Sequence, residues 1–158
     1  MLLILIRHGI AQETSSDGTD GARRLTTAGK SQVRRVARGL KRKIGKPGKI
    51  VASPLVRADQ TAAILTSVLG GNYSHAKELG EPKVGRIIRA LSKRKERLVI
   101  AVGHQPMLGQ TAVRLLTGRK GPEFVDLDKA GPIAMEWSGQ VGELATLMWM
   151  ATPQMMGR

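Results

Sequence analysis

Two histidines and two arginines follow short apolar runs of this sequence, in a pattern that suits phosphate chemistry. Arg7-His8-Gly9 follows the first run, Arg57 comes shortly after the second, and His104 follows the third. The planar fork of donors on arginine matches phosphate oxygens, and two such groups can hold a dianion during transfer. Imidazole is a good nucleophile near neutral pH when one ring nitrogen stays unprotonated. The pattern predicts a phosphate-handling site that contains a histidine.

Backbone features beside these side chains also favour an anion site. Gly9 and Gly103 would let the chain approach a ligand closely, and Gln105 follows His104 in the third motif. Pro106 suits the first turn of a helix, whose free amide groups could face an anion. Gly9 and Gln105 are therefore candidate substrate-binding residues, together with the arginines and His104.

These residues can meet only if the apolar runs are strands of one sheet. The runs are Leu2–Ile6, Ile50–Ala52 and Leu98–Val102. Continuous apolar character over a few residues is typical of parallel strands that are covered on both faces. Ligands of open α/β sheets bind beyond the carboxyl ends of the strands, which is where all three motifs fall.

Helical patterns lie between the apolar runs, because apolar residues recur there every three or four positions. They extend from Thr26 to Gly45, from Pro54 to Gly70, around Val84 to Leu91, and from Leu108 to Gly118. The alternation of strands and helices predicts an α/β fold with right-handed crossovers. Ile133–Trp137 and Glu143–Met150 predict a closing hairpin. We expect residues 151–158 to be a loose tail of a single domain that spans residues 1–158.

Charge and composition restrict the partners. There are 26 Lys and Arg against 12 Asp and Glu, a net charge of +14, which attracts anions without selecting among them. Aromatic residues make up only 3%, too few for a module that stacks bases, so nucleic acid is not the expected partner. With no cysteine there is neither a disulfide frame nor a thiol nucleophile.

The first helical pattern carries much of the positive charge. The charged residues opposite its apolar stripe are Lys30, Arg34, Arg38, Lys41 and Arg42. Such a face is by default solvated, and steering of an acidic partner is the alternative hypothesis. The opening apolar run reaches Arg7 after six residues, so it predicts neither a signal peptide nor a membrane span, and a cytoplasmic protein is expected.

The three motifs together resemble the histidine phosphatase superfamily, also called phosphoglycerate-mutase-like. The resemblance is closest to its short SixA-type branch of phosphohistidine phosphatases, and it runs from Met1 to about Trp137. The residues that carry it are Arg7-His8-Gly9, the segment from Ser53 to Thr61, Gly103-His104, the segment from Leu25 to Gly29, and Glu78-Leu79. It implies a single-domain sandwich with a mostly parallel sheet and no large helical cap.

The resemblance also implies roles for the site residues. His8 would attack phosphorus and become the phosphohistidine intermediate. Arg7, Arg57 and His104 would bind the phosphoryl oxygens, and water would then release phosphate without a cofactor or metal ion. Glu78 matches the position of the general acid in many members of the superfamily.

Other residues near the motifs are less decisive. Glu13 and Asp17 are fallback candidates for the general acid. Ile10-Ala11 departs from larger relatives, which often place there a polar residue that assists the phosphate. We expect His75 to be an ordinary loop residue, because it follows none of the apolar runs.

Three functions remain open from the sequence. The first is hydrolysis of phosphohistidine on a protein, such as a histidine phosphotransfer domain, because the short segment from Gly70 to Arg97 implies an open pocket. The second is hydrolysis of small phosphomonoesters, such as nucleotide or sugar phosphates, by the same mechanism. The third is a non-catalytic basic module that binds polyanions. The oligomeric state is left open.

Overall fold

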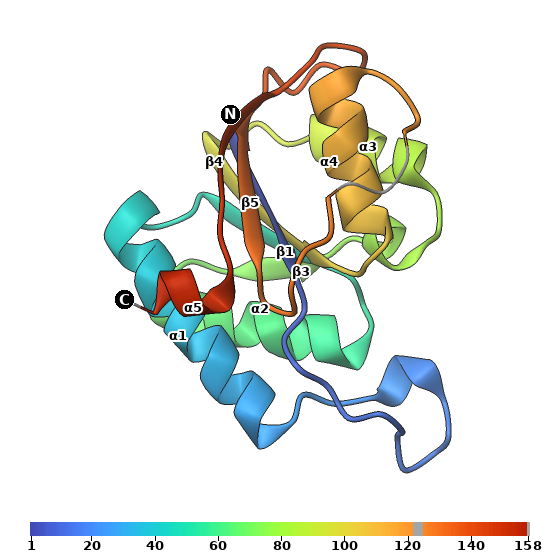
Figure 1. Cartoon of the computed structure of the whole chain (residues 1–158), viewed down its shortest axis with the longest axis vertical. Helices are drawn as coiled ribbons and strands as arrows, with labels where there is room; N and C mark the ends of the chain where they lie inside the picture. The colour runs from blue at the N-terminus through green and yellow to red at the C-terminus, as the bar shows by residue number, and fades with distance from the viewer. Residues whose placement is uncertain (122–124, 158) are drawn as a thin grey trace.

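A six-stranded sheet forms the centre of the protein, with helices on both of its faces (Figure 1). The computed structural model describes residues 1–121 and 125–157. The strand order is β3-β2-β4-β1-β5-β6. β1 (Leu2–Arg7) and β2 (Lys49–Ala52) both pair in parallel with β4 (Leu98–Gly103). The three apolar runs are thus neighbouring strands, as predicted, and their carboxyl ends meet at one edge of the sheet.

Side chains of β1 alternate between two hydrophobic cores, because successive residues of a strand point to opposite faces. Leu3 and Leu5 belong to the core beneath α3 (Val84–Ser92) and α4 (Met107–Thr117). Ile4 and Ile6 belong to the core beneath α1 (Thr27–Ile44) and α2 (Val56–Leu69). Burial on both faces explains why β1 is apolar throughout.

The first helix begins after a threonine N-cap and ends at a glycine, as its sequence predicts. The Thr26 side chain accepts a hydrogen bond from the Gly29 amide at 2.9 Å, so it caps the first turn of α1. Gly45 ends the helix with a φ of 69°, a conformation that glycine adopts without strain. Val33, Val36 and Leu40 are buried against the sheet, which leaves the charged residues on the outer side.

The segment between α2 and β4 holds a strand that the sequence analysis missed. β3 (Tyr73–His75) pairs in parallel with β2 and is followed by the short helix η2 (Lys77–Gly80) and then by α3. His75 therefore ends a strand, and the expectation of a loop residue was wrong. Three polar residues at the edge of the sheet give no apolar pattern from which a strand could be predicted. The segment forms no large helical cap.

The C-terminal part confirms the predicted hairpin and corrects the predicted tail. β5 (Pro132–Glu136) is antiparallel to both β1 and β6 (Thr146–Met150). The chain then forms α5 (Pro153–Met156), which packs on α1 (Figure 1). Met156 is 1% exposed, and its backbone lies so close to Gly39 that a Cβ there would collide with it. Burial of Met156 holds this segment in place, so at least residues 153–156 are not loose.

One further 3-10 helix, η1 (Asp20–Ala22), lies in the long connection between β1 and α1. Within residues 1–121 and 125–157, no helix is long and apolar enough to cross a membrane.

Candidate active site

His8 follows β1 directly, and its side chain is held in one tautomer. The ring is 6% exposed, and Nδ1 lies 2.7 Å from the carbonyl oxygen of Gly9. A carbonyl oxygen can only accept, so Nδ1 carries the proton and Nε2 carries the lone pair. Burial above all, and then the positive charges around the ring, lower the pKa of His8 to about 3. The ring is therefore neutral at pH 7, with Nε2 available as a nucleophile.

Arg57 brings a positive charge to this lone pair. Its Nε donates to His8 Nε2 at 3.2 Å from the first turn of α2. Both outer nitrogens bind Asp20: Nη1 donates to the backbone oxygen at 2.7 Å and Nη2 to Oδ2 at 2.9 Å. The Arg57 side chain is only 8% exposed, so these three bonds fix its orientation.

Asp20 is a site residue that the sequence analysis missed. It lies in η1, and its carboxylate also pairs with Arg23 at 2.8 Å. Hydrogen bonds from Arg23 and Arg57 hold the pKa of Asp20 below its ordinary value, so the group is charged at neutral pH. The only signal in the sequence is an acidic residue in the connection after the first motif, where Glu13 and Asp17 are equally eligible.

His104 follows β4 and faces His8 across the edge of the sheet. The two ring centroids are 5.2 Å apart with an angle of 53° between the rings. His104 Nε2 lies 2.8 Å from the hydroxyl oxygen of Ser53. Ser53 follows β2 directly and is fully buried. Burial and then the charge of Arg57 lower the pKa of His104 to about 4. Both histidines are thus neutral at pH 7.

Arg7 ends β1 beside both rings. Its charge is among those that lower the pKa values of His8 and His104. Nη1 donates to the carbonyl oxygen of Leu127 at 2.8 Å, whereas Nε is buried and has no hydrogen-bond partner among the described residues. Arg7, His8, Arg57 and His104, here called the His–Arg cluster, therefore converge as the sequence predicted. Two fixed cations around two neutral rings suit an anion with a reacting centre near Nε2.

Gly9 has a packing role besides any role in binding. A Cβ at this position would lie 2.6 Å from Val33 Cγ2 and 3.1 Å from the carbonyl oxygen of Gly29, both on α1. The Gly9 amide donates to Thr61 Oγ1 at 3.1 Å, and the Thr61 hydroxyl donates to the Arg57 carbonyl at 2.7 Å. Thr61 thereby ties the loop after β1 to the helix that carries Arg57.

Gln105 is occupied by contacts within the chain. Its Nε2 donates to the Val125 carbonyl and to Asp126 Oδ1, each at 3.1 Å, and its Oε1 accepts from the Gly109 amide at 2.8 Å. These bonds hold the chain before β5 against the first turn of α4. Binding of substrate by Gln105 stays a prediction.

The structure connects none of the three predicted acids to the cluster by a hydrogen bond within the described ranges. Glu78 is half-buried in η2 and lines a shallow depression with Lys77, Arg86 and Arg89. Glu13 and Asp17 are exposed, and hydrogen bonds from Thr19 and Ser15 lower the pKa of Asp17. No group of three or more acidic or histidine side chains that could hold a metal ion occurs in residues 1–121 and 125–157.

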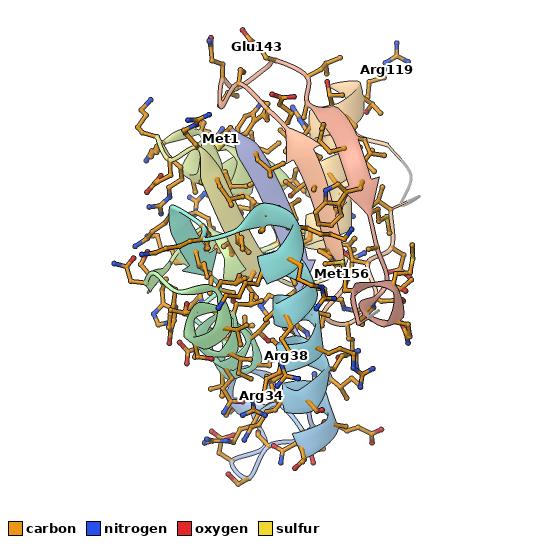
Figure 2. The ribbon with its side chains drawn as sticks, turned by 90° about the vertical axis from the view of Figure 1, so that its left-hand side faces the viewer. Met1, Arg34, Arg38, Arg119, Glu143 and Met156 are labelled. Atoms are coloured by element: carbon orange, nitrogen blue, oxygen red, sulfur yellow. The ribbon has the colours of Figure 1, made fainter. Side chains whose placement is uncertain are left out.

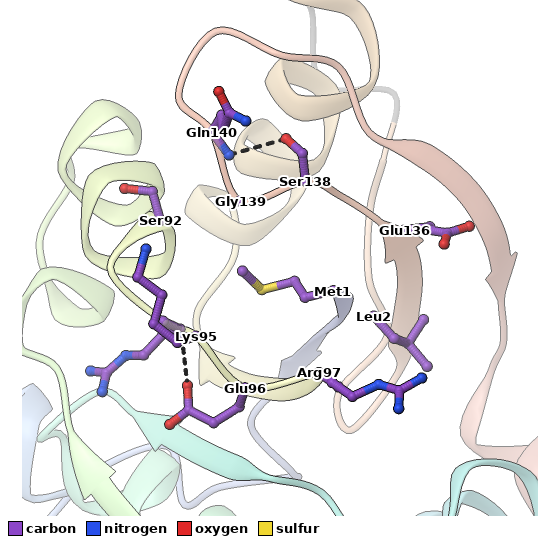
Figure 3. A pocket seen from close by; sticks show the side chains of 11 residues that line it. Met1, Leu2, Ser92, Lys95, Glu96, Arg97, Glu136, Ser138, Gly139 and Gln140 are labelled. Atoms are coloured by element: carbon purple, nitrogen blue, oxygen red, sulfur yellow. Dashed lines mark hydrogen bonds between the residues drawn. The ribbon is translucent and has the colours of Figure 1, made fainter.

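A cavity of about 710 Å³ lies at the opposite end of the sheet (Figure 3). Met1, Leu2 and Arg97 line it at the amino ends of β1 and β4, and Lys95 and Glu136 also belong to its lining. It contains side chains of both charge signs and no member of the His–Arg cluster. The cavity is therefore separate from the candidate active site.

Known proteins share both the sequence pattern and the fold. The model of the histidine phosphatase superfamily (branch 1) matches residues 3–98. An uncharacterized protein of Picosynechococcus sp. (strain ATCC 27264 / PCC 7002 / PR-6) is 34% identical over 140 residues, which cover 85% of this chain and 84% of that protein. Phosphohistidine phosphatase SixA of Escherichia coli (strain K12) is 28% identical over 151 residues, which cover 87% and 92%. The structure of the protein histidine phosphatase SixA complexed with tungstate matches with a TM-score of 0.84 at 25% identity and covers 99% of both chains.

Proposed function

The chain belongs to the histidine phosphatase superfamily (branch 1), and from this premise we propose that it hydrolyses phosphohistidine on a protein, with His8 as the nucleophile. The observation that carries the proposal is the state of the His8 ring. The bond from Nδ1 to Gly9 leaves Nε2 unprotonated, and Arg57 and His104 stand beside it. A neutral imidazole next to fixed cations suits attack on a phosphoryl group.

In the first step, His8 Nε2 forms a bond to phosphorus while the bond from phosphorus to the substrate imidazole breaks. The electron pair of that bond stays on the leaving nitrogen, which takes up a proton. Arg7, Arg57 and His104 hold the phosphoryl oxygens as charge moves to them. The Gly9 carbonyl accepts from Nδ1 and stabilises the positive charge that develops on the His8 ring.

In the second step, water attacks phosphorus and the bond to His8 Nε2 breaks. The electron pair returns to the ring, a proton leaves the attacking water, and inorganic phosphate departs. Glu78 is our candidate for the group that moves protons in both steps. No step of this scheme calls on a metal ion or cofactor, since the guanidinium groups meet the phosphoryl charge.

A protein substrate is favoured by the short connection between α2 and β4. That connection, residues 70–97, holds β3, η2 and α3 and adds no large helical cap over the carboxyl edge of the sheet. An uncapped site can accept a side chain on a protein surface. The relative from Escherichia coli that covers 87% of this chain is a phosphohistidine phosphatase, which supports the same substrate class. We further propose that residues 1–158 form a single catalytic domain.

Trapping the phosphorylated enzyme tests the proposal. The protein is mixed with a labelled phosphohistidine peptide, quenched within one turnover, and analysed for acid-labile, base-stable phosphate. We expect the label on His8 and its loss in His8→Asn. His75→Asn is the matched control, because it removes an exposed histidine from β3 and should keep the label. Labelling of another residue, or labelling that survives in His8→Asn, contradicts the mechanism.

A panel of small phosphate esters separates the two catalytic hypotheses. Hydrolysis of a phosphohistidine peptide with a higher kcat/KM than nucleotide and sugar phosphates supports the protein substrate. The opposite order supports the small-molecule phosphatase. Binding of polyanions without phosphate release supports the non-catalytic alternative. The ordered His–Arg cluster does not favour that alternative.

A further inference from the structure

We propose that one side of α1 binds an acidic surface of the phosphoprotein substrate beside the candidate active site. The residues are Lys30, Arg34, Arg38 and Lys41, here called the basic stripe. The inference rests on the proposed function, because it assumes a protein substrate. It adds a second contact area and specifies the charge of the substrate surface.

The basic stripe starts next to the His–Arg cluster. The loop after His8 is bonded to the first turns of α1, where the Thr26 amide donates to the Ile10 carbonyl at 3.0 Å and the Ile10 amide to Gln32 Oε1 at 3.2 Å. From Lys30 the stripe continues along the helix to Lys41, a distance of about 16 Å at 1.5 Å per residue. Figure 2 shows Arg34 and Arg38 along α1, with Met156 of α5 beside the helix.

The cations of the stripe repel one another and pair with no acidic group of the described residues. Lys30, Arg34 and Arg38 are spaced by four residues, so like charges are neighbours on the helix surface and destabilise it. α1 contains no acidic residue, and no ion pair to the stripe occurs among residues 1–121 and 125–157.

The remaining arginines of α1 make contacts on the side of α5. The side chain of Arg35 lies against Gly157, and Arg42 Nη2 donates to the Met156 carbonyl at 3.3 Å. Arg42, which the sequence pattern grouped with the charged face, therefore contributes to the fold. Since packing on α5 explains Arg35 and Arg42, the basic stripe and Lys43 of the last turn are left to face an external anion.

An acidic protein fits this stripe better than a membrane or a nucleic acid. The apolar residues of α1, among them Val33 and Leu40, are buried against the sheet, so the helix has no apolar side to insert into lipid. α1 carries no aromatic side chain, so the stripe offers no ring on which a base could stack. A row of carboxylates with helical spacing matches the row of cations.

Two phosphopeptides test the inference. Each is helical and carries one phosphohistidine; one has glutamates at four-residue spacing, and the other has glutamine at those positions. We expect kcat/KM for the glutamate peptide to be about tenfold higher at about 20 mM salt. At about 0.5 M salt the ratio should fall below about twofold, because exposed charges are then screened.

Two charge-matched variants locate the effect. Arg34→Gln/Arg38→Gln/Lys41→Gln removes three charges from the stripe and should abolish the preference for the glutamate peptide without changing turnover of the glutamine peptide. Lys95→Gln/Arg97→Gln/Arg119→Gln removes three exposed charges away from the stripe and should keep the preference. Lys95 and Arg97 line the cavity of Figure 3, and Arg119 follows α4 at the end of the molecule far from Arg34 and Arg38 (Figure 2). An equal loss in both variants assigns the effect to net charge and overturns the inference.

The other outcomes are also decisive. If the wild type hydrolyses both peptides at the same rate, the stripe plays no part in substrate binding while the proposed function stands. If neither peptide is hydrolysed, the proposed function fails and the inference fails with it. If a DNA duplex inhibits more strongly than the unphosphorylated glutamate peptide, and the stripe variant removes that inhibition, the surface binds nucleic acid and the inference is wrong.

Discussion

Lowering the pH from 6.5 to 5 should destabilise the protein, and His8 alone should account for about 2 kcal/mol of the loss. In the unfolded chain the pKa of a histidine is about 6.5, whereas burial lowers the pKa of His8 to about 3 in the folded protein. Below pH 6.5 the His8 ring therefore takes up a proton in the unfolded chain, whereas it stays unprotonated in the folded protein. Each pH unit of this difference costs about 1.4 kcal/mol of unfolding free energy.

The pH window separates this effect from that of the carboxylates. The pKa values of Asp20 and Glu81 are lowered by hydrogen bonds from arginines, so these groups stabilise the folded protein above the ordinary carboxyl pKa. That stabilisation is lost only as the pH falls below about 4. Between pH 6.5 and 5 the loss therefore comes from histidines.

Urea unfolding at pH 6.5 and pH 5 measures the effect, with tryptophan fluorescence as the signal, to which Trp137, 1% exposed, and Trp149 contribute. In His8→Asn the loss between the two pH values should be smaller than in the wild type by about 2 kcal/mol. His104→Asn should change in the same direction, because the pKa of His104 is lowered to about 4. Equal losses in the wild type and His8→Asn would show that the folded ring titrates at its ordinary pKa and would refute the lowering of the His8 pKa by burial.

Three substitutions test other contacts of the site. Arg57→Lys removes the planar fork that binds Asp20, and should lower kcat/KM about 100-fold in a phosphate-release assay. A loss below about threefold contradicts the proposed role of Arg57 in holding the phosphoryl oxygens. Asp20→Asn should lower kcat/KM about tenfold because Arg57 loses its charged partner, whereas Asp17→Asn, the control, should leave it unchanged. Gly9→Ala should lower the free energy of unfolding by about 1–3 kcal/mol, because its Cβ meets Val33. In a Val33→Ala background the same substitution should cost less, and an equal cost in both backgrounds would argue against this clash.

Much of the site could be predicted because each motif adjoins a strand with a strong apolar pattern. The patterns of Leu2–Ile6 and Leu98–Val102 follow from burial on both faces, and parallel pairing then brings His8 and His104 to one edge. The prediction failed where elements were too short to show a pattern. β3 has three residues and α5 has four, and both are held by contacts with distant parts of the chain.

The sequence by itself determined which residues are candidates for phosphate chemistry, because histidine and arginine at the ends of apolar strands are recognisable one segment at a time. Only the tertiary structure decided which carboxylate binds Arg57. Asp20 reaches Arg57 across 37 positions, whereas Glu13 and Asp17 in the same connection remain exposed. The tautomer of His8 was likewise decided by burial and by the orientation of the Gly9 carbonyl. The apolar pattern of a segment indicates its burial. Hydrogen bonds between segments depend instead on how the loops fold back onto the sheet.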